Sequence, residues 1–443
     1  SRENYKITMN YDFSVDNGFV DEGVIRSYYA QTKFIQDTNE KRNSRRGTPL
    51  AQYRHFTFSQ KNIGLELNLY KTYESSWATH QLVYGFDFKS ADIEELRDGT
   101  ETNLTTGVTV PMILGEVFPR RDFPNSQVDE LGLFILDEIK LADSAWTIIP
   151  ALRVDYYKLT PSRDALFDVN GADTEVVSIN TSDFSPKLGL MYAINDNANI
   201  YAQYVRGFRA PPFDDVNIGL NIPLFHIRAI ANPDLKSETS NGFEFGYRYF
   251  GETQQFNLTA FFTKYHDFIE TKARIGFDAA TETVLFQSRN IDKAEISGLE
   301  LSHKWQINDN FSCYTSLALT RGVNQTKDEP LNSISPAKAV NNIQWNSDNN
   351  KWNVNLYSTF VAKQDRVSTE RHDLFQPAGY SVYDLFIDYK LAEKQNLRFG
   401  LFNLTNKKYW DWQQVRNFEE NDAVLQALSK PSRNLSFSYS IEM

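Results

Sequence analysis

The segment 208–236 contains side chains whose types could bind a ligand, and its composition is unlike that of a turn. Near its centre stands His226, flanked by Leu224, Phe225 and Ile227. A neutral imidazole is a common metal ligand, and apolar neighbours would suit an apolar ligand. The residues alone leave a second interpretation open, in which His226 is a surface histidine without a ligand.

Two arginines of the same segment could complete such a site. The guanidinium groups of Arg209 and Arg228 could each bind a carboxylate of the ligand, because guanidinium binds carboxylates in a bidentate manner. For Arg209 the alternative is structural, since it could order the loop through backbone carbonyls or through Asp214 and Asp215. A further histidine, His372, could assist in capturing the ligand or could be an ordinary surface residue.

The segment 208–236 is too long for a hairpin turn. Loops of this length without structure of their own are usually functional or disordered. Disorder is not expected here, because the segment is rich in Phe, Ile and Leu and contains four prolines that restrict the backbone. These are Pro211, Pro212, Pro223 and Pro233. An ordered loop carried on a scaffold of strands is a reasonable place for a binding site.

A second long segment, 94–127, combines several apolar residues with Arg97, Arg120 and Arg121. It has two interpretations. The segment could contact a protein that carries the ligand, or it could fold over the mouth of the scaffold.

Composition and motifs argue against several classes of function. The formal net charge of -11 argues against nucleic-acid binding, which would need a basic face. The single cysteine, Cys313, excludes an intramolecular disulfide and a cysteine-based metal site. The sequence has no phosphate-binding glycine loop, no Gly-x-Ser-x-Gly and no His-Glu-x-x-His. We therefore expect neither catalysis nor a catalytic cofactor.

The scaffold that carries these segments is expected to be all-β. Polar and apolar residues alternate strictly in 3–16, and the same pattern returns in 237–250, 379–391 and 433–442. Period two over about a dozen residues is long for a globular strand but suits a tilted strand that crosses a membrane. Such strands number about 17: 3–16, 22–37, 52–72, 78–93, 128–141, 145–159, 183–195, 198–207, 237–250, 254–271, 284–306, 311–322, 336–346, 351–363, 379–391, 395–405 and 433–442.

The connections between these strands alternate between short and long. Outer-membrane barrels have short periplasmic turns and long extracellular loops, whereas a soluble sandwich has no reason to alternate in this way. The pattern therefore predicts an antiparallel transmembrane β-barrel whose apolar face contacts outer-membrane lipid. Trp305, Trp352, Trp410 and Trp412 lie near strand ends and are expected in the interfacial aromatic girdles.

The odd number of strands leads to a further expectation. The last strand of such a barrel runs toward the periplasm, so the first strand, 3–16, would run the same way. An odd number of strands would then precede the chain. For a barrel of the size that has about 22 strands, about five would be missing.

Several motifs resemble those of the TonB-dependent outer-membrane receptors, and most closely their haem and haemoglobin receptor branch. Residues 208–211 (Phe-Arg-Ala-Pro) match the family's FRAP box and 232–235 (Asn-Pro-Asp-Leu) its NPNL or NPDL box. Further matches lie at 84–87, 123–126, 132–138, 294–300 and 401–410, so the resemblance covers nearly the whole chain. Most of these motifs mark TonB-dependent receptors generally, and only the paired boxes with a ligand residue between them point to haem.

The resemblance implies that 1–443 is the C-terminal portion of a receptor barrel in the bacterial outer membrane. An N-terminal plug domain, which contacts TonB, would lie outside the chain together with the first strands. Haem, free or taken from haemoglobin, would be the transported ligand, and TonB would deliver the energy for import. The family's loop ligand is His or sometimes Tyr, and 208–236 contains no Tyr, so the resemblance points to His226 as an axial ligand of haem iron, with Phe225 beside the apolar macrocycle. Arg209 and Arg228 could then pair with the haem propionates.

Two departures and two alternatives accompany the resemblance. Asp234 stands where some members have Asn, and the chain ends in Met443 instead of an aromatic residue, which puts the assembly signal in doubt more than the fold. A ferric-siderophore receptor is an alternative that would need no axial histidine. A passive porin-like channel is another, but porins have about 16–18 strands and no plug.

Overall fold

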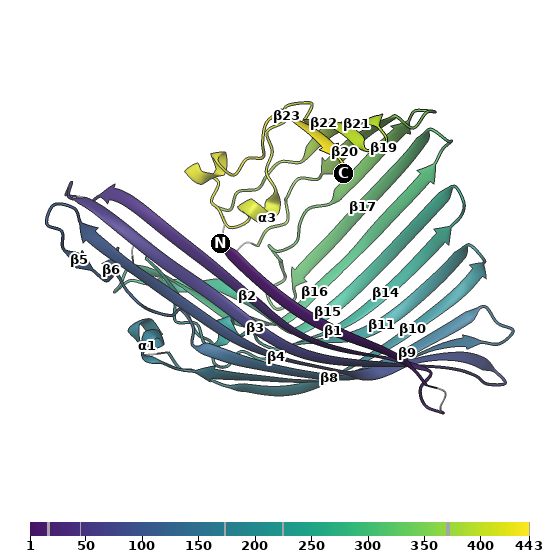
Figure 1. The fold of residues 1–443 in the computed structure, drawn as a ribbon, viewed down its shortest axis with the longest axis horizontal. Coiled ribbons are helices and arrows are strands. Elements are labelled where there is room, and N and C mark those ends of the chain that lie inside the picture. The colour runs from purple at the N-terminus through teal and green to yellow at the C-terminus, as the bar shows by residue number, and fades with distance from the viewer. Residues whose placement is uncertain (16–17, 45, 172–173, 224–225, 369–372, 443) are drawn as a thin grey trace.

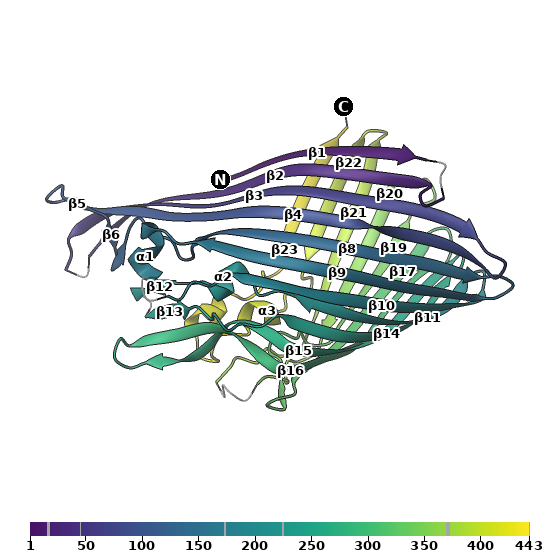
Figure 2. The same ribbon diagram turned by 90° about the horizontal axis from the view of Figure 1, so that it is seen from below.

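The computed structural model describes residues 1–15, 18–44, 46–171, 174–223, 226–368 and 373–442. Its main element is one large sheet of long antiparallel strands, which lie side by side in chain order (Figure 1). This order follows from the sequence, because each strand is joined to the next by a reversal of the chain and pairs with it. Figure 2 shows the strands running together toward one end of the molecule and separating into loops at the other.

Seventeen long strands form this meander in the described residues, in agreement with the expected number. They are β1 (Arg2–Ser14), β2 (Glu22–Asn43), β3 (Pro49–Glu74), β4 (Ala78–Asn103), β8 (Asn125–Leu141), β9 (Trp146–Ser162), β10 (Ile179–Asn195), β11 (Ala198–Arg209), β14 (Glu238–Phe250), β15 (Gln254–Asp278), β16 (Thr283–Gln306), β17 (Phe311–Asn324), β19 (Lys338–Asn346), β20 (Trp352–Val361), β21 (Tyr380–Ala392), β22 (Gln395–Phe402) and β23 (Asn434–Ile441).

The outer ends of several strands extend further than the alternation of residue types predicts. β4 continues to Asn103 instead of residue 93, and β15 continues to Asp278 instead of residue 271. Cross-strand hydrogen bonds still satisfy the backbone there. The alternation stops earlier, because an extension beyond the membrane no longer needs one apolar face.

One face of the sheet is apolar and exposed. On β8, Leu131, Leu133 and Ile135 are all exposed, and their neighbours on β9 include Leu152 and Val154, also exposed. Alternate residues of a strand point to opposite faces, so these side chains form continuous rows on one side of the sheet. Exposed apolar rows of this kind are what barrel strands present to lipid.

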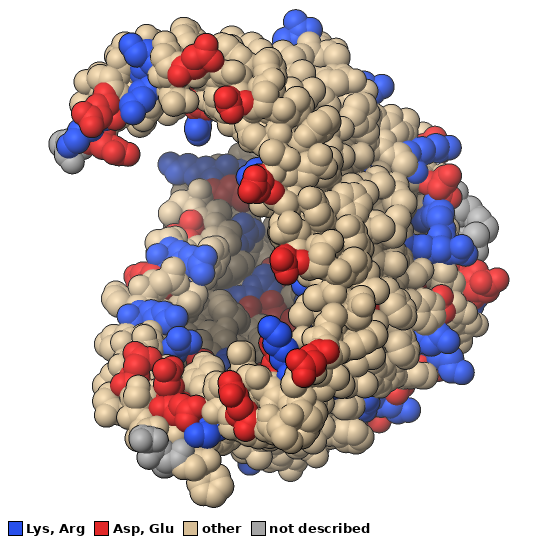
Figure 3. All heavy atoms as spheres, turned by 90° about the vertical axis from the view of Figure 1, so that its right-hand side faces the viewer, with Lys and Arg blue, Asp and Glu red and all other residues tan. Residues whose placement is uncertain are grey.

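The opposite face carries ion pairs. Arg153 of β9 reaches across β8 to Asp87 of β4, with 2.6 Å between Nη1 and Oδ1, and it also pairs with Asp155. It crosses β8 over Gly132, where a Cβ atom would lie 1.9 Å from the guanidinium. In Figure 3 charged side chains reach into the hollow of the molecule, whereas a broad part of the visible surface has few of them.

The sheet curves into an arc that does not close. In the described residues β1 pairs with β2 alone and β23 with β22 alone, so both strands are free edges. Figure 3 shows the resulting C shape, with its hollow open on one side. Strands β1 and β23 both run from the long-loop side to the short-turn side, as an odd number of strands requires.

The helices are short and lie among the long loops: α1 (Ala165–Gly171), α2 (Phe213–Val216) and α3 (Trp412–Val415). None of the helices in the described residues is long and apolar enough to cross a membrane.

The last long loop, 403–433, packs on itself. Trp412 is 2% exposed, and the indole N–H groups of Trp410 and Trp412 donate to backbone carbonyls at 2.7 and 2.9 Å. The expectation that these two residues belong to an aromatic girdle was therefore wrong, because both are packed among the outer loops, where Trp412 donates to Asn332 of a neighbouring loop. Trp305 and Trp352, in contrast, are exposed beside short turns.

Replacing Leu133 by Arg should destabilise the sheet in a membrane, because it puts a charge in the middle of the apolar face. The cost of Arg near the bilayer midplane is about 2–4 kcal/mol. Reversible unfolding in lipid vesicles would measure it. Gln81→Arg, on the polar face of β4 beside Glu138, is the matched control and should cost less than about 1 kcal/mol. Equal losses in the two variants would contradict the assignment of the faces.

Candidate ligand-binding loop

The loop that contains His226 joins β11 to β14 and is built from α2, β12 (Asn221–Ile222) and β13 (Ile227–Ile230). β12 and β13 form a small antiparallel ladder. β13 then pairs in parallel with the outer part of β16, with Ile227 beside Val284. Figure 2 shows these elements beside the outer ends of β15 and β16. The long loop is therefore ordered by pairing with the sheet.

The NPDL motif fastens the end of this loop to β16. The side-chain amide of Asn232 donates to the carbonyl of Ser288 at 2.8 Å, and its oxygen accepts the N–H of Asp234. Asn290 of β16 bonds the backbone of Lys236 in both directions, at 2.8 and 3.0 Å. The motif thus shapes the loop through hydrogen bonds to the backbone.

The short helix α2, which follows the FRAP motif, contacts the same strand. Asp215 of α2 is 3% exposed, and its Oδ1 accepts the hydroxyl hydrogen of Ser288 at 2.8 Å. The Ser288 hydroxyl oxygen in turn accepts the N–H of Lys272. Burial raises the pKa of Asp215 above its usual value. The NPDL motif and the short helix that follows the FRAP motif therefore meet at one buried serine of β16.

Arg209 lies at the base of the loop. Its Nη1 is 3.8 Å from Oε2 of Glu238, and its side chain is about half exposed. The same Glu238 oxygen accepts the N–H of Ile269 in β15. In this position Arg209 joins the strand before the loop to the strand after it, and its carboxylate partner is Glu238 instead of Asp214 or Asp215.

His226 lies at the far end of the loop. Its carbonyl accepts the N–H of Val284 at 2.7 Å, whereas Ile269, beside Arg209, pairs with Asn290. Six residues of extended strand, from 284 to 290, span about 20 Å. The structure therefore does not bring Arg209 and His226 together.

Arg228 is the arginine that lies near His226. Both residues are exposed, and Arg228 faces Asn221 in the ladder of β12 and β13. The backbone of His226 has a φ of 52° and its N–H donates to the carbonyl of Pro223. Among the described residues its imidazole has no hydrogen-bond partner. The backbone is held on both sides while the side chain faces solvent.

Two of the expected site residues, Phe225 and His372, lie outside the described residues. The apolar contact expected from Phe225 and the accessory role expected from His372 therefore stay predictions.

The arginines of the segment 94–127 are buried instead of exposed. Arg97 and Arg120 form ion pairs with Glu116 and Asp122, and Glu95 adjoins them. These five residues are called the mouth cluster below. Arg120 is 1% exposed, so it cannot contact another protein. The apolar residues Val108, Val110 and Met112 of the same segment are exposed, so both interpretations of the segment stay predictions. Glu116 and Asp122, which stand close to Arg120 in the sequence, were the signal that could have predicted these ion pairs.

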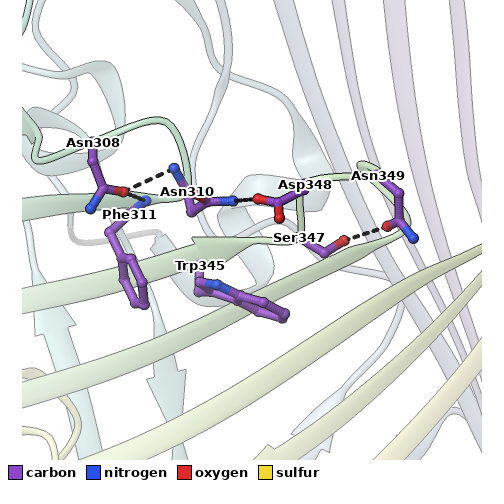
Figure 4. A pocket seen from close by; sticks show the side chains of 7 residues that line it. All are labelled: Asn308, Asn310, Phe311, Trp345, Ser347, Asp348 and Asn349. Carbon is purple, nitrogen blue, oxygen red and sulfur yellow. Dashed lines mark hydrogen bonds between the residues drawn. The ribbon is translucent and has the colours of Figure 1, made fainter.

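A pocket of about 480 Å³ lies between two short turns, at the opposite end of the strands from His226. Figure 4 shows the rings of Phe311 and Trp345 next to a polar row in which Asn310 donates to Asp348 and Ser347 to Asn349. Because this pocket lies at the opposite end of the strands, it is not part of the candidate site. In the part of the chain that the structure describes, no group of three or more His, Cys, Asp or Glu side chains could hold a metal ion.

Replacing Ser288 by Ala should loosen the loop, because the buried carboxylate of Asp215 would lose its donor. The expected cost is about 1–3 kcal/mol at neutral pH. Because the pKa of Asp215 is raised, the folded loop binds its proton more tightly than the open loop does. Loop stability therefore falls as pH rises through that pKa, and the loss in Ser288→Ala should be larger at a pH value above it, where the carboxylate is ionised, than at one below it.

Hydrogen exchange of the amides in 210–237 would measure this effect. Ser302→Ala, on the same strand but away from the loop, is the control. A loss that is the same at both pH values would contradict the role given to Asp215.

Comparison with known proteins identifies the family. The family described as "TonB dependent receptor-like, beta-barrel" matches residues 1–404. The "Hemoglobin-haptoglobin utilization protein B" of Neisseria meningitidis serogroup A is 26% identical over 304 residues, which are 58% of this chain and 36% of that protein. The "Hemoglobin and hemoglobin-haptoglobin-binding protein" of Haemophilus ducreyi is 26% identical over 54% of this chain and 29% of its own length. The chain thus spans about a third of the length of these relatives.

Solved structures show the same fold at low sequence identity. The "Copper transporter OprC" superposes with a TM-score of 0.78 at 18% identity, over 99% of this chain and 65% of that one. The "ferric citrate transporter FecA in the unliganded form" gives a TM-score of 0.69 at 15% identity, over 99% and 61%. These proteins and their family are transport receptors of the bacterial outer membrane. This chain belongs to the TonB-dependent receptor β-barrel family of outer-membrane proteins.

Proposed function

We propose that this protein is an outer-membrane receptor that binds haem, free or from haemoglobin, at its outer loops and imports it with energy from TonB. His226 would be an axial ligand of the iron. Arg228 would pair with a propionate. Arg209 would order the base of the loop through Glu238 and would not contact the haem.

The observation that carries this proposal is the placement of His226. Its backbone is fixed by hydrogen bonds on both sides, and its imidazole is exposed on the long-loop side of the sheet. An imidazole coordinates iron through a free ring nitrogen, and a fixed main chain limits how far the ring can move. The names of two relatives, which mention haemoglobin and haptoglobin, support the same ligand class.

We further propose that this chain is the C-terminal portion of a larger barrel. The free edges of β1 and β23 support this, because an unpaired edge would leave backbone groups without partners in lipid. About five further strands would complete a barrel of about 22 strands. A plug domain would fill the barrel and contact TonB. The exposed apolar face would contact outer-membrane lipid.

A haemin titration of the purified protein in detergent, followed by the haem absorbance band, tests the ligand. The protein should show a saturable band. His226→Ala should change the ligand signature of the band and weaken binding at least tenfold, which is about 1.4 kcal/mol. Arg228→Met should weaken binding without changing the signature, because a propionate contact leaves the iron ligands in place.

His55→Ala removes another histidine of the long-loop side and is the control for unspecific haem binding. An unchanged band in His226→Ala would remove His226 from the site but keep haem as the ligand. The absence of any saturable band would favour the alternative of a ferric-siderophore receptor.

A further inference from the structure

The mouth cluster is a set of buried charges on the inner face of the sheet. Arg97 holds Asp122 with Nη1 at 2.9 and 3.0 Å from the two carboxylate oxygens. Arg120 lies with Nη1 3.2 Å from Glu116 and Nη2 3.5 Å from Asp122. Glu95 accepts the backbone N–H of Asp122 at 2.9 Å. Buried charges are tolerated only when they are paired and hydrogen-bonded, so this cluster is a costly feature to build.

The cluster is joined directly to the loop that contains His226. The second guanidinium nitrogen of Arg120 donates to the carbonyl of Asn221 at 2.9 Å. The carbonyl of Asp122 accepts the N–H of Gly219 at 2.7 Å. Asn221 belongs to β12, which pairs with β13 immediately after His226. Two residues of the cluster therefore hold the strand that positions the candidate ligand.

Other parts of the loop are held by other segments, since Asn217 bonds the backbone of Val177 in both directions at 2.8 and 3.0 Å. Gly115 lies against Pro223, where an added Cβ would be 3.5 Å from the proline ring, and Ala229 donates to the carbonyl of Leu220 within the loop itself. The bonds from Arg120 and Asp122 are thus the polar link between the segment 104–124 and β12.

The charges of the cluster do not balance when every carboxyl is ionised. Three carboxylates then face two guanidinium groups, and the surplus negative charge lies between Glu95 and Asp122. When Glu95 is protonated, two charges of each sign remain. Burial and the neighbouring Asp122 raise the pKa of Glu95 to about 7, so this change falls in the physiological range.

The surroundings of Glu95 come from four elements. β4 itself contributes Arg97, and β7 (Glu116–Val117) contributes Glu116. The segment that follows β7 contributes Arg120, Asp122 and Arg121, whose guanidinium donates to the backbone carbonyl of Glu95 and also pairs with Asp164. β3 contributes an apolar neighbour, Phe58. In the described residues these are the charged groups around Glu95.

We propose that the mouth cluster is a positioning device: through Arg120 and Asp122 it holds the segment that presents His226, and it holds this segment more firmly when Glu95 is protonated. Arg120, Asp122 and Glu95 are positioning residues in this scheme and do not touch the ligand. The consequence for haem rests on the proposed function, whereas the effect on the loop does not.

Hydrogen exchange in the ligand-free protein tests the effect on the loop. Protection factors of the Gly219 and Ala229 amides, corrected for intrinsic exchange, report how often the loop opens. If Glu95 returns to an ordinary pKa in the open loop, protection should fall about tenfold between pH 6 and pH 8. Glu95→Gln keeps the shape without the charge, so its protection should be equal at the two pH values and as high as that of the wild type at pH 6.

Further variants separate positioning from a general loss of structure. Arg120→Met should lose protection at both pH values, and Arg120→Lys should recover part of it, because lysine keeps the charge but not the fork of donors. Glu66→Gln removes the carboxylate of a similar pair with Arg26, far from the loop, and should keep the pH response of the wild type. A wild-type protection that does not change with pH, or a tenfold fall that persists in Glu95→Gln, would overturn the proposal.

Haemin titrations of the same variants separate this proposal from the proposed function. Arg120→Met should weaken haemin binding but keep the ligand signature of the bound fraction, whereas His226→Ala should change the signature. If loop protection depends on pH but the protein shows no haem band, the proposed haem function is refuted and the positioning role of the mouth cluster stands. If His226 binds haem but loop protection does not depend on pH, the proposed function stands and the positioning role of the mouth cluster is refuted.

Discussion

Pairing of the backbone between neighbouring strands is the interaction on which the rest of this structure depends. A membrane offers no water to backbone N–H and C=O groups, so a spanning sheet must satisfy them between its own strands. The meander of seventeen strands does so at each internal position, and it leaves β1 and β23 as the two edges. With the backbone satisfied, side chains are free to differ between the two faces. One face is apolar and exposed, and the other carries ion pairs such as that of Arg153 with Asp87.

The sheet provides rigid attachment points, and the outer loops provide the chemistry. Two parts of the His226 loop are fastened to β16: Asp215 of α2, after the FRAP motif, accepts the hydroxyl hydrogen of Ser288, and Asn232 of the NPDL motif donates to its carbonyl. The motifs are thus architecture, and they explain how a loop of this length stays ordered. They leave the imidazole of His226 exposed.

Buried charge is concentrated where two outer loops meet at the mouth of the arc. Taking Arg120 and its partners out of water is unfavourable unless the pairs are well formed. Such a cluster therefore fixes the relative position of the segments that contribute to it more strictly than apolar packing would. The raised pKa values of Glu95 and Asp215 have the same origin, since burial penalises the ionised form of each carboxyl.

The sequence by itself determined the all-β class, the number and order of the long strands, and the alternation of short turns with long loops, because these follow from period-two patterns that are local in the chain. It also singled out His226 and the two motifs beside it. Arg228 lies near His226 because the two are close in the sequence, whereas only the tertiary structure decided that Arg209 lies about 20 Å from His226. It also decided that Arg97 and Arg120 are buried in ion pairs and that Trp410 and Trp412 are packed among the outer loops. These facts depend on contacts between residues far apart in sequence, such as the parallel pairing of β13 with β16, and no local pattern of residue types encodes them.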